Sequence, residues 1–231
     1  MTDEYRFLDR AAYLPAADAL VVADLHVGRD RTSGVELPLG EREDLTDRLA
    51  TLLRAVDPGE VVLAGDLLDA FGSVPRGVEG TVTALRDVVV RFSADLVVVR
   101  GNHDAMLEAV CDEPVHDEYR LADGTVVCHG HEPVEADARR YLAGHDHPAI
   151  EIEGRRRPCF LLGREVYRGR DVLLLPAFNS LVSGTTVNGA SGTDLLSPLA
   201  RDLDRFRPIV RDADAEQTLR FPPLGKFRRL L

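Results

Sequence analysis

Short apolar runs that end in Asp, Asn or His recur along the first two thirds of the chain. The clearest covers residues 95–100 (DLVVVR), and Gly101, Asn102, His103 and Asp104 follow it directly. A valine-rich run of this kind predicts a buried strand, and open α/β sheets place their ligands at the carboxyl ends of such strands. Four other segments repeat the arrangement, at residues 19–23, 61–64, 125–128 and 141–143. We therefore expect five strand ends to converge and to bring their polar side chains together.

Two segments between these runs predict amphipathic helices. Residues 41–56 carry apolar side chains at offsets 0, 4, 7, 8 and 11 from Leu45, and Pro58 and Gly59 follow. This is the spacing of one helical face. Residues 78–92 show a similar apolar face. Because strand and helix alternate here, the pattern indicates an α/β architecture.

The pattern changes on both sides of this core. Residues 1–18 predict an edge hairpin or a lead-in to the first strand. From Ala149 onward, short apolar runs alternate with turns rich in Arg and Gly, which predicts a second, mostly antiparallel sheet packed on the first. These runs cover residues 150–152, 159–162, 172–175 and 181–187. We expect one domain over residues 1–231, with a motif core at 19–147 and the second sheet and C-terminal segment at 148–231.

The amino-acid composition mainly excludes certain classes of protein. Hydrophobic residues make up 45% of the 231 residues, which is enough for a sizeable core. No run approaches the roughly 18 to 20 apolar residues of a membrane span, and the amino terminus MTDEYRF lacks the apolar region of a secretory signal. We therefore expect a cytoplasmic protein with no membrane partner. The three cysteines stand far apart, which argues against a disulfide framework or a thiolate zinc site.

The net charge of −11 comes from an unusual set of residues, because Lys226 is the only lysine among the 28 basic side chains. A lysine-poor, acidic surface resembles that of proteins from salt-loving microbes, so we expect a halophilic protein. In ~1 M salt the Debye length is only ~3 Å, and such a surface then repels a polyanion weakly. The charge therefore does not exclude a nucleic-acid substrate.

The residues that end the five runs form a series of short motifs. In order they are D-x-H at 24–26, G-D-x-x-D at 65–69, G-N-H-D at 101–104, H-G-H at 129–131 and G-H-x-H at 144–147. Six of the seven histidines fall inside this series, and only His116 lies outside it. Carboxylate, amide oxygen and imidazole together form a ligand set that suits Mn, Fe or Zn rather than Ca. The series therefore predicts a metal-dependent site.

In its order and spacing, this series resembles the calcineurin-like metallophosphoesterase superfamily. The phrases ADLHVG, CHGHEP, GHDHP, RPCFLL and LLLPAFNSLVSG are most similar to its DNA-ligase-associated and ICC-like phosphoesterases. The resemblance implies a four-layer α-β-β-α sandwich with two packed mixed sheets. It also implies two divalent ions, with Mn²⁺ as the expected metal and Fe or Zn as alternatives.

The resemblance assigns the metal ligands residue by residue. The first ion would be held by Asp24, His26, Asp66 and His147. The second would be held by Asp66, Asn102, His129 and His145, with Asp66 bridging the two ions. Such a pair of ions lowers the pKa of a shared water and holds the attacking and leaving oxygens, which is what the hydrolysis of phosphate esters requires.

His103 is not needed as a ligand, and the resemblance implies that it protonates the leaving alkoxide. Imidazole suits this task because its reference pKa is ~6.5. Asp69 would orient His103, although a carboxylate at the start of a helix is an alternative interpretation. We expect Asp104 to cap a helix that begins near Ala105.

Several other polar residues have two interpretations each. Arg29, Arg31 and His131 are candidates for contacts with the substrate phosphate, but solvated side chains would give the same pattern. The basic runs at 155–157 and 164–170 would hold a nucleic-acid backbone, or lie on a solvated strand edge.

Three more residues are singled out by their positions. Asn179 and Asn188 fall in a segment that resembles a late part of the family, and they are candidates for shaping the pocket. Asp146 separates His145 and His147, and we expect its side chain to face away from the metals.

The sequence therefore predicts a two-metal hydrolase of phosphoester bonds. We expect a phosphodiesterase or nuclease that acts on nucleotides or single-stranded nucleic acid, with a role in DNA repair beside a ligase or helicase. A phosphomonoesterase or protein phosphatase with the same centre is an alternative. A non-catalytic binding scaffold is a second alternative, but the ligand set is complete, and this favours an enzyme.

Overall fold

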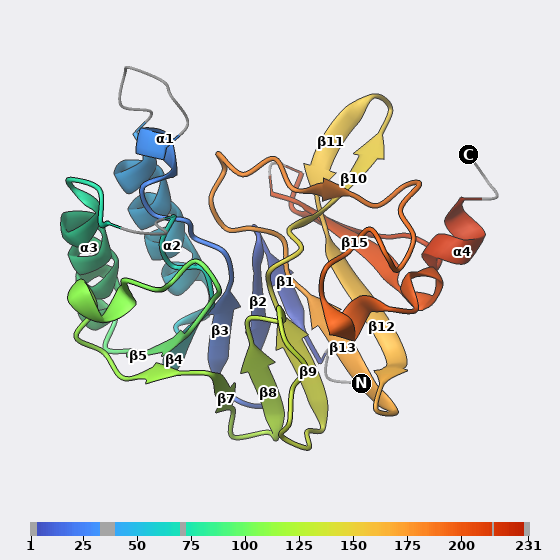
Figure 1. Cartoon of the computed structure of the whole chain (residues 1–231), viewed down its shortest axis with the longest axis horizontal. Coiled ribbons are helices and arrows are strands. Elements are labelled where there is room, and N and C mark those ends of the chain that lie inside the picture. Colours follow the sequence, from blue (N-terminus) through green and yellow to red (C-terminus); the bar gives the residue numbers. More distant parts are fainter. Residues whose placement is uncertain (1–3, 33–39, 70–72, 214, 229–231) are drawn as a thin grey trace.

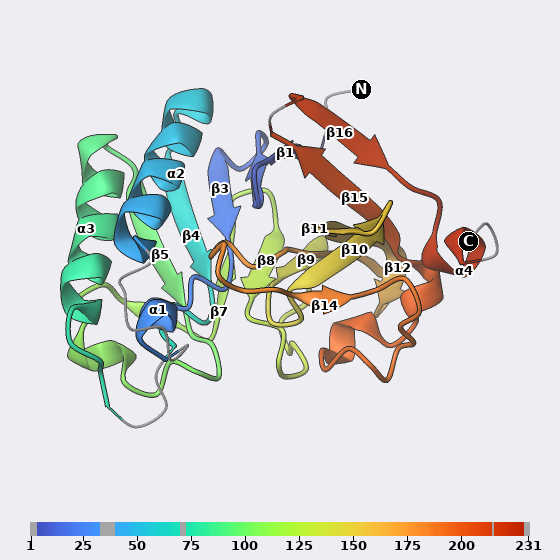
Figure 2. The ribbon, with the colours of Figure 1, turned by 90° about the horizontal axis from the view of Figure 1, so that it is seen from above.

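Two large β-sheets pack face to face at the centre of the molecule (Figures 1 and 2). The computed structural model describes residues 4–32, 40–69, 73–213 and 215–228. Side chains of both sheets meet in a buried cluster between them, with Val62 from one sheet and Leu142 from the other. The predicted fold class, an α/β sandwich with two packed mixed sheets, is confirmed.

The first sheet has the strand order β1-β2-β3-β4-β5-β6. Its strands are β1 (Arg6–Leu8), β2 (Ala11–Leu14), β3 (Ala19–Val22), β4 (Glu60–Ala64), β5 (Asp95–Val99) and β6 (Val115–His116). Strands β3 to β6 pair in parallel, whereas β1 and β2 form the predicted antiparallel hairpin at the edge. The central strands consist of continuous Val and Leu runs because both of their faces are covered.

Two long helices, α2 (Glu41–Val56) and α3 (Val78–Arg91), cover the outer face of the first sheet (Figure 1). Both lie where the apolar spacing predicts them. Their apolar faces, which include Leu45 and Leu85, share one buried cluster with the sheet. A short helix, α1 (Arg29–Thr32), lies in the segment between β3 and α2. Among the described residues, no helix has both the length and the apolar character of a membrane span.

The second sheet has the order β16-β15-β12-β13-β9-β8-β7 and is mostly antiparallel. Its strands are β7 (Glu118–Arg120), β8 (Thr125–Cys128), β9 (Arg140–Ala143), β12 (Phe160–Tyr167), β13 (Arg170–Leu174), β15 (Arg207–Asp212) and β16 (Gln217–Arg220). Because β8 and β9 belong here, the prediction that the second sheet starts at residue 148 is wrong. Buried runs look alike in either sheet, and only long-range pairing assigns them.

A small third sheet lies beside the second one, in the order β11-β10-β14. Its strands are β10 (Pro148–Ile152), β11 (Arg155–Pro158) and β14 (Thr185–Thr186). The prediction of a strand over residues 181–187 is therefore wrong, because only β14 (Thr185–Thr186) is a strand there. Asn179 is the physical reason, because its side-chain oxygen accepts a hydrogen bond from the Leu181 backbone at 2.9 Å and turns the chain.

Short elements rather than long helices cover the outer face of the second sheet. They are α4 (Leu224–Phe227) and the 3-10 helices at Pro198–Ala200 and Leu203–Arg205. Another 3-10 helix, Leu107–Ala109, follows β5 and is not part of this cover. Side chains from this cover and from the outer face of the sheet share a third buried cluster, which includes Leu199 and Phe206. The fourth layer of the sandwich is therefore mostly irregular.

The fold brings the carboxyl ends of β3, β4 and β5 beside those of β8 and β9. Two contacts join the sheets at this edge. The backbone N–H of His145, which follows β9, donates to both carboxylate oxygens of Asp24, which follows β3, at 3.1 and 3.0 Å. The backbone N–H of Phe178 donates to the Ala23 carbonyl at 2.8 Å. The five predicted strand ends therefore meet in one place.

Candidate metal centre

Among the described residues, three groups of side chains with atoms that can bind a metal lie at this shared edge, and two of them match the predicted ligand sets. Atoms that can bind a metal lie within 4.8 Å of one another in a first group, Asp24, His26, Asp66 and His147. The same limit holds for a second group, Asp66, His129 and His145. Asn102 joins the second group, because its Oδ1 lies 2.9 Å from Nε2 of His129. The structure thus brings together the same two sets of residues that the family resemblance names.

Ring nitrogens face one another within each group. In the first group, Nε2 of His26 lies 3.1 Å from Nε2 of His147, which lies 3.4 Å from Oδ1 of Asp24. In the second, Nδ1 of His145 lies 3.1 Å from Nε2 of His129. Ligand atoms at bond lengths of about 2.0 to 2.2 Å around one ion are about 3.0 to 3.5 Å apart in tetrahedral or octahedral geometry. Both groups therefore fit a divalent transition-metal ion.

Asp66 lies between the two groups, and its two carboxylate oxygens make different contacts. Its Oδ1 accepts a hydrogen bond from the His103 backbone at 2.9 Å. Its Oδ2 lies 3.8 Å from Nε2 of His26 and 3.4 Å from Nε2 of His129. The backbone contact thus orients the carboxylate so that one oxygen faces both groups, which is the geometry of a bridging ligand.

The backbone is strained at most of these positions. Five of the seven residues have positive φ angles, namely Asp24 (57°), His26 (43°), Asp66 (47°), His145 (74°) and His147 (46°). Residues other than glycine seldom adopt this left-handed region, and each such residue costs about 1 to 3 kcal/mol. Strain of this kind persists only where the surrounding contacts enforce it, and it concentrates at functional sites. Nothing in the hydrophobic pattern predicts it.

Glycines next to the cluster leave room for its close packing. A Cβ atom at Gly101 would lie 2.1 Å from the backbone nitrogen of Asp66, and one at Gly65 would lie 2.3 Å from Nδ1 of His129. Both distances are far below van der Waals contact. The G-D and G-N pairs in the motifs therefore reflect a steric requirement.

Burial sets the protonation of the second group in the metal-free protein. Burial lowers the pKa of His129 to about 3 and that of His145 to about 4, so both rings are neutral at physiological pH. Burial, and then the charge of Asp24, raise the pKa of Asp66 to about 7. Neutral imidazoles are the form that binds metal, and a divalent ion would relieve the repulsion between the two carboxylates.

Asp24 and His147 form an ion pair in the first group. Burial opposes the charged form of each, but their mutual attraction and the charges of neighbouring residues together outweigh it, so the pKa of Asp24 is lowered and that of His147 is raised. In the metal-free protein His147 therefore balances part of the charge of Asp24, and a bound metal would require the neutral form of the ring.

His103 lies beside the shared carboxylate. Its Nε2 is 3.9 Å from Oδ2 of Asp66, and its Nδ1 is 4.0 Å from Oδ1 of Asp69. Asp69 is buried, and the same Oδ1 lies 3.5 Å from Nδ1 of His26 and 3.4 Å from Nη1 of Arg29. Asp69 thus lies closer to the ring of His26 than to that of His103, and the three residues form a third group whose ligand atoms lie within 4.8 Å of one another. The sequence did not predict the contact between Asp69 and His26.

The three candidates for substrate binding, Arg29, Arg31 and His131, differ in their distance from the metal centre and in how much of them the structure describes. The guanidinium of Arg29 contacts the carboxylate of Asp69. Arg31 lies in α1, but its side chain is outside the described residues. The ring of His131 lies 5.1 Å from that of His129 and 6.1 Å from that of His145, at the side of the second group.

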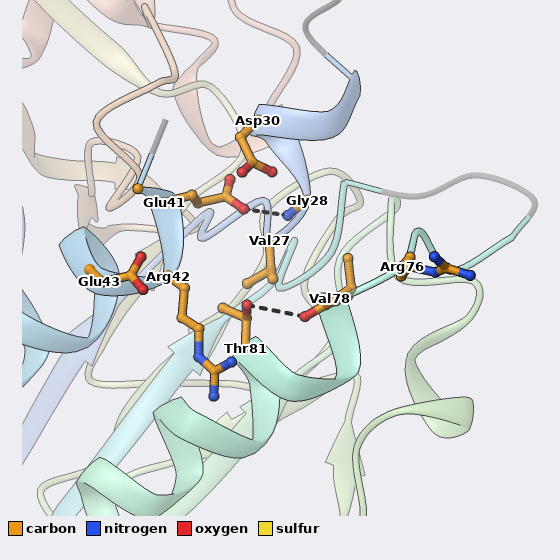
Figure 3. A pocket seen from close by; sticks show the side chains of 11 residues that line it. Val27, Gly28, Asp30, Glu41, Arg42, Glu43, Arg76, Val78 and Thr81 are labelled. Carbon is orange, nitrogen blue, oxygen red and sulfur yellow. Dashed lines mark hydrogen bonds between the residues drawn. The ribbon is translucent and has the colours of Figure 1, made fainter. Parts of the chain in front are cut away.

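Two buried residues hold the loop after β3 in place. The Glu41 carboxylate accepts a hydrogen bond from the backbone of Gly28 at 2.7 Å (Figure 3). It also accepts one from the backbone of Arg29 at 3.0 Å. The Asn179 amide donates to Glu41 at 2.9 Å and to the Leu25 carbonyl at 2.8 Å. Glu41 has no signal in the sequence beyond its place at the start of a predicted helix. Both residues position the segment that carries Asp24 and His26.

Asn188 and Asp146 have structural roles away from the cluster. Asn188 exchanges two hydrogen bonds with the backbone of Glu151 in β10, at 2.8 and 2.9 Å. Asp146 accepts from the backbone of Leu196 at 2.7 Å and of Ser197 at 3.2 Å, so its side chain faces away from the metal centre, as expected.

The prediction that Asp104 caps a helix is wrong. The next helix is the short 3-10 turn Leu107–Ala109, and it has no side-chain cap. Instead, the fully buried Asp104 carboxylate accepts from the backbone of Gly101 at 2.8 Å, Leu67 at 3.2 Å and Leu68 at 2.9 Å. It therefore links the loops that carry Asp66 and Asn102.

Replacing Asp104 with alanine is expected to lower the free energy of unfolding by about 3 kcal/mol, because buried backbone donors lose their acceptor. Urea denaturation of the metal-free protein measures this change. The matched control is Asp112→Ala at an exposed position, which should change stability by less than about 0.5 kcal/mol. Equal stability of the two variants would contradict a linking role for Asp104.

A cluster of buried carboxylates and imidazoles at the strand ends of two packed sheets is typical of a metal-dependent hydrolase. Residues 18–173 match the family model described as calcineurin-like phosphoesterase. The match covers more than half of the chain, and the protein belongs to the calcineurin-like phosphoesterase family.

Two solved structures are similar to this one. The nuclease MPE of Pseudomonas putida is 28% identical, with a TM-score of 0.63, and the match covers 91% of this chain and 92% of that one. The phosphoesterase Yfce of E. coli is 15% identical, with a TM-score of 0.46 and coverage of 89% and 98%, and so weak a likeness supports no argument. No curated protein matches the chain. Family membership and the likeness to MPE make this protein a hydrolase of phosphoester bonds.

Metal binding should be visible as thermal stabilisation. An ion present at 100 times its dissociation constant adds about 2.7 kcal/mol, which raises Tm by about 5 to 10 °C for a chain of this length. Thermal melting with Mn²⁺ and with a chelator measures the difference. Ca²⁺ should stabilise the protein less, because four of the seven candidate ligands are imidazoles. Identical melting with Mn²⁺ and with the chelator would contradict the metal assignment.

Proposed function

We propose that this protein is a two-metal phosphodiesterase that cleaves nucleotides or single-stranded nucleic acid. The observation that carries the proposal is the position of Asp66, whose Oδ2 faces a ring nitrogen of each group. A shared oxygen between two complete ligand sets favours two ions close together over two independent sites.

The chain's own residues prepare the site for an anion. Asp24 and Asp66 together cancel only part of the charge of two divalent ions, so the centre attracts a phosphate ester. When bound, such ions activate a water and stabilise the phosphoryl oxygens. The seven candidate ligands are held by strand ends and by the contacts of Asp104, Glu41 and Asn179, so the arrangement is preorganised.

His103 is the proposed general acid. Its Nε2 lies on the side of Asp66, where a leaving oxygen would be, while Nδ1 faces Asp69. Burial, and then the neighbouring ring of His26, lower the pKa of His103 in the free protein. An anionic ester bound beside the ring would favour the protonated form. The imidazolium would then donate its proton from Nε2 to the leaving alkoxide.

The metal and the biological role are proposed from the ligand chemistry and from the likeness to other proteins. We propose Mn²⁺, with Fe or Zn as alternatives, because the ligands mix carboxylate, amide and imidazole. We also propose a role in DNA repair beside a ligase or helicase. The support is the likeness of the sequence motifs to ligase-associated relatives, together with the structural likeness to a protein named as a nuclease.

Turnover of two chromogenic esters tests the proposal. The protein with Mn²⁺, in high salt, should hydrolyse bis(4-nitrophenyl) phosphate faster than 4-nitrophenyl phosphate. The reverse preference would favour a phosphomonoesterase with the same centre. No hydrolysis of either ester with any of Mn²⁺, Fe²⁺ or Zn²⁺ would overturn the proposal and favour a binding scaffold.

A further inference from the structure

A cavity of about 230 Å³ adjoins the metal centre at His147. It lies between the β10–β11 hairpin and the segment after β13, on the side of the molecule where the five strand ends meet (Figure 1). Two arginines, Arg10 and Arg156, line it, and no described carboxylate does. In a chain with a net charge of −11, an acid-free cavity beside the site is a distinct electrostatic feature.

Arg10 lines this cavity and has hydrogen-bond donors that no described residue uses. Its Nη1 donates to the carbonyls of Ala177 at 3.1 Å and Asn179 at 3.0 Å, while Nε and Nη2 make no hydrogen bond to a described residue. Burial, and then the charge of Arg48, lower the pKa of Arg10, and the charges of Asp9 and Asp44 offset only part of this shift. A bound anion would therefore stabilise the guanidinium as well as receive its free donors.

Arg156 is the only member of the basic run 155–157 that lines the cavity. Successive side chains of a strand point to opposite faces, so Arg155 and Arg157 lie on the other face of β11. Arg157 pairs with Asp212 at 3.0 Å on that face. Nη1 of Arg156 lies 3.4 Å from the Gly184 carbonyl across the cavity wall. The structure thus separates the three arginines, which the sequence alone treats as one patch.

A second cavity, beside the second group of the metal centre, has mostly acidic side chains among its charged lining residues. A cavity of about 610 Å³ beside His129 and His131 is lined by four carboxylates, those of Asp117, Glu118, Glu132 and Glu135. Arg100 is the single lining arginine there, and it pairs with Glu108 and Asp117. A polyanion that extends from the metal centre is therefore repelled on this flank and attracted on the Arg10 and Arg156 flank.

We propose that the cavity lined by Arg10 and Arg156 is a subsite for a phosphate next to the one being cleaved. The substrate class is then a linear polyphosphodiester, a nucleic-acid strand, rather than an ester with one phosphate. This inference rests on the proposed phosphodiesterase function, and it adds the direction in which the strand leaves the metal centre.

The variant Arg156→Gln tests the subsite, with Arg155→Gln as the matched control on the other face of the same strand. The measured quantity is kcat/KM for a short single-stranded DNA oligonucleotide divided by kcat/KM for bis(4-nitrophenyl) phosphate, which has a single phosphate. Arg156→Gln should lower this ratio about tenfold, because one charge-assisted contact to the second phosphate is lost. Arg155→Gln should leave the ratio unchanged.

Binding without catalysis provides an independent readout. Fluorescence anisotropy of the same oligonucleotide with metal-free protein gives the slope of log affinity against log salt. Arg156→Gln should reduce the steepness of this slope by about 0.7, the value for one contact to a single strand, and Arg155→Gln should not.

Three outcomes would overturn the subsite. They are an unchanged ratio and slope for Arg156→Gln, equal losses in both variants, and a wild-type protein whose oligonucleotide affinity does not depend on salt. Failure of the proposed function looks different, because the wild-type protein would then hydrolyse no ester while the binding difference between the two variants persists.

Discussion

Asp66→Asn is expected to abolish turnover, by at least roughly 10³-fold, and to remove metal from both sites. Asparagine keeps the size of the side chain, and its amide oxygen can still accept from the His103 backbone, which donates to Oδ1 at 2.9 Å in the native protein. Its NH₂ group then takes the position of Oδ2, which faces both groups, and an NH₂ group cannot bind a metal ion. One substitution therefore removes a ligand from two ions at once.

The same variant should leave the metal-free protein at least as stable as the native one at pH 8. Burial, and then Asp24, raise the pKa of Asp66 to about 7, above the value of 3.8 for an unperturbed carboxyl. A group with a raised acid pKa destabilises the folded state increasingly as pH rises through that range. Removing its charge should thus raise Tm with chelator present, while the stabilisation by Mn²⁺ is lost.

Metal analysis, ester turnover and thermal melting together decide this prediction. The control is Asp117→Asn, whose carboxylate is 95% exposed and contacts Arg100. It should keep two bound ions and native turnover. If Asp66→Asn still held two ions and cleaved bis(4-nitrophenyl) phosphate at the native rate, Asp66 would not bridge the two sites.

His103→Ala should keep both metal ions and lower turnover by about 10² to 10⁴-fold for substrates with poor leaving groups. His103 belongs to neither of the two predicted ligand sets, and 23% of its side chain is exposed, so truncation should leave those seven residues in place. Because His103 also forms a third group with His26 and Asp69, metal analysis of the variant checks that both ions remain bound. General acid catalysis matters most when the leaving oxygen is strongly basic. The loss should therefore be small for a nitrophenolate and large for the alkoxide of a nucleotide.

A comparison of leaving groups separates this role from a structural one. The ratio of rates for bis(4-nitrophenyl) phosphate and a dinucleotide should rise in His103→Ala. In the control His116→Ala, which changes a histidine outside the motifs, the ratio should be native. An equal loss on both substrates, or no loss on either, would remove His103 from the acid role.

Local patterns predicted the parts of the fold that depend on neighbouring residues. Helix α2 covers the predicted residues 41–56, because a repeating apolar face specifies a helix wherever it later packs. The strands that carry the motifs also lie where their apolar runs predict them. The order of motifs, through the family resemblance, named the seven residues that the structure brings together. Their role as metal ligands stays a prediction.

Long-range packing decided what these patterns could not. The placement of β8 and β9 in the second sheet depends on which strand lies beside which. The same is true of Asp104, which links two loops through backbone donors as far as 37 positions away in sequence. No periodicity encodes such contacts, because they join residues that are distant in the chain.

The sequence by itself determined the kinds of side chain at five strand ends, and hence the class of metal they suit. Only the tertiary structure decided that Asp66 presents one oxygen to both groups, that five candidate ligands have left-handed backbone, and that Arg156 faces the metal centre's acid-free flank. The physical reason is that residue type and spacing are local properties of the chain. The direction of a side chain and the strain on its backbone are set by contacts that form only when distant segments pack together.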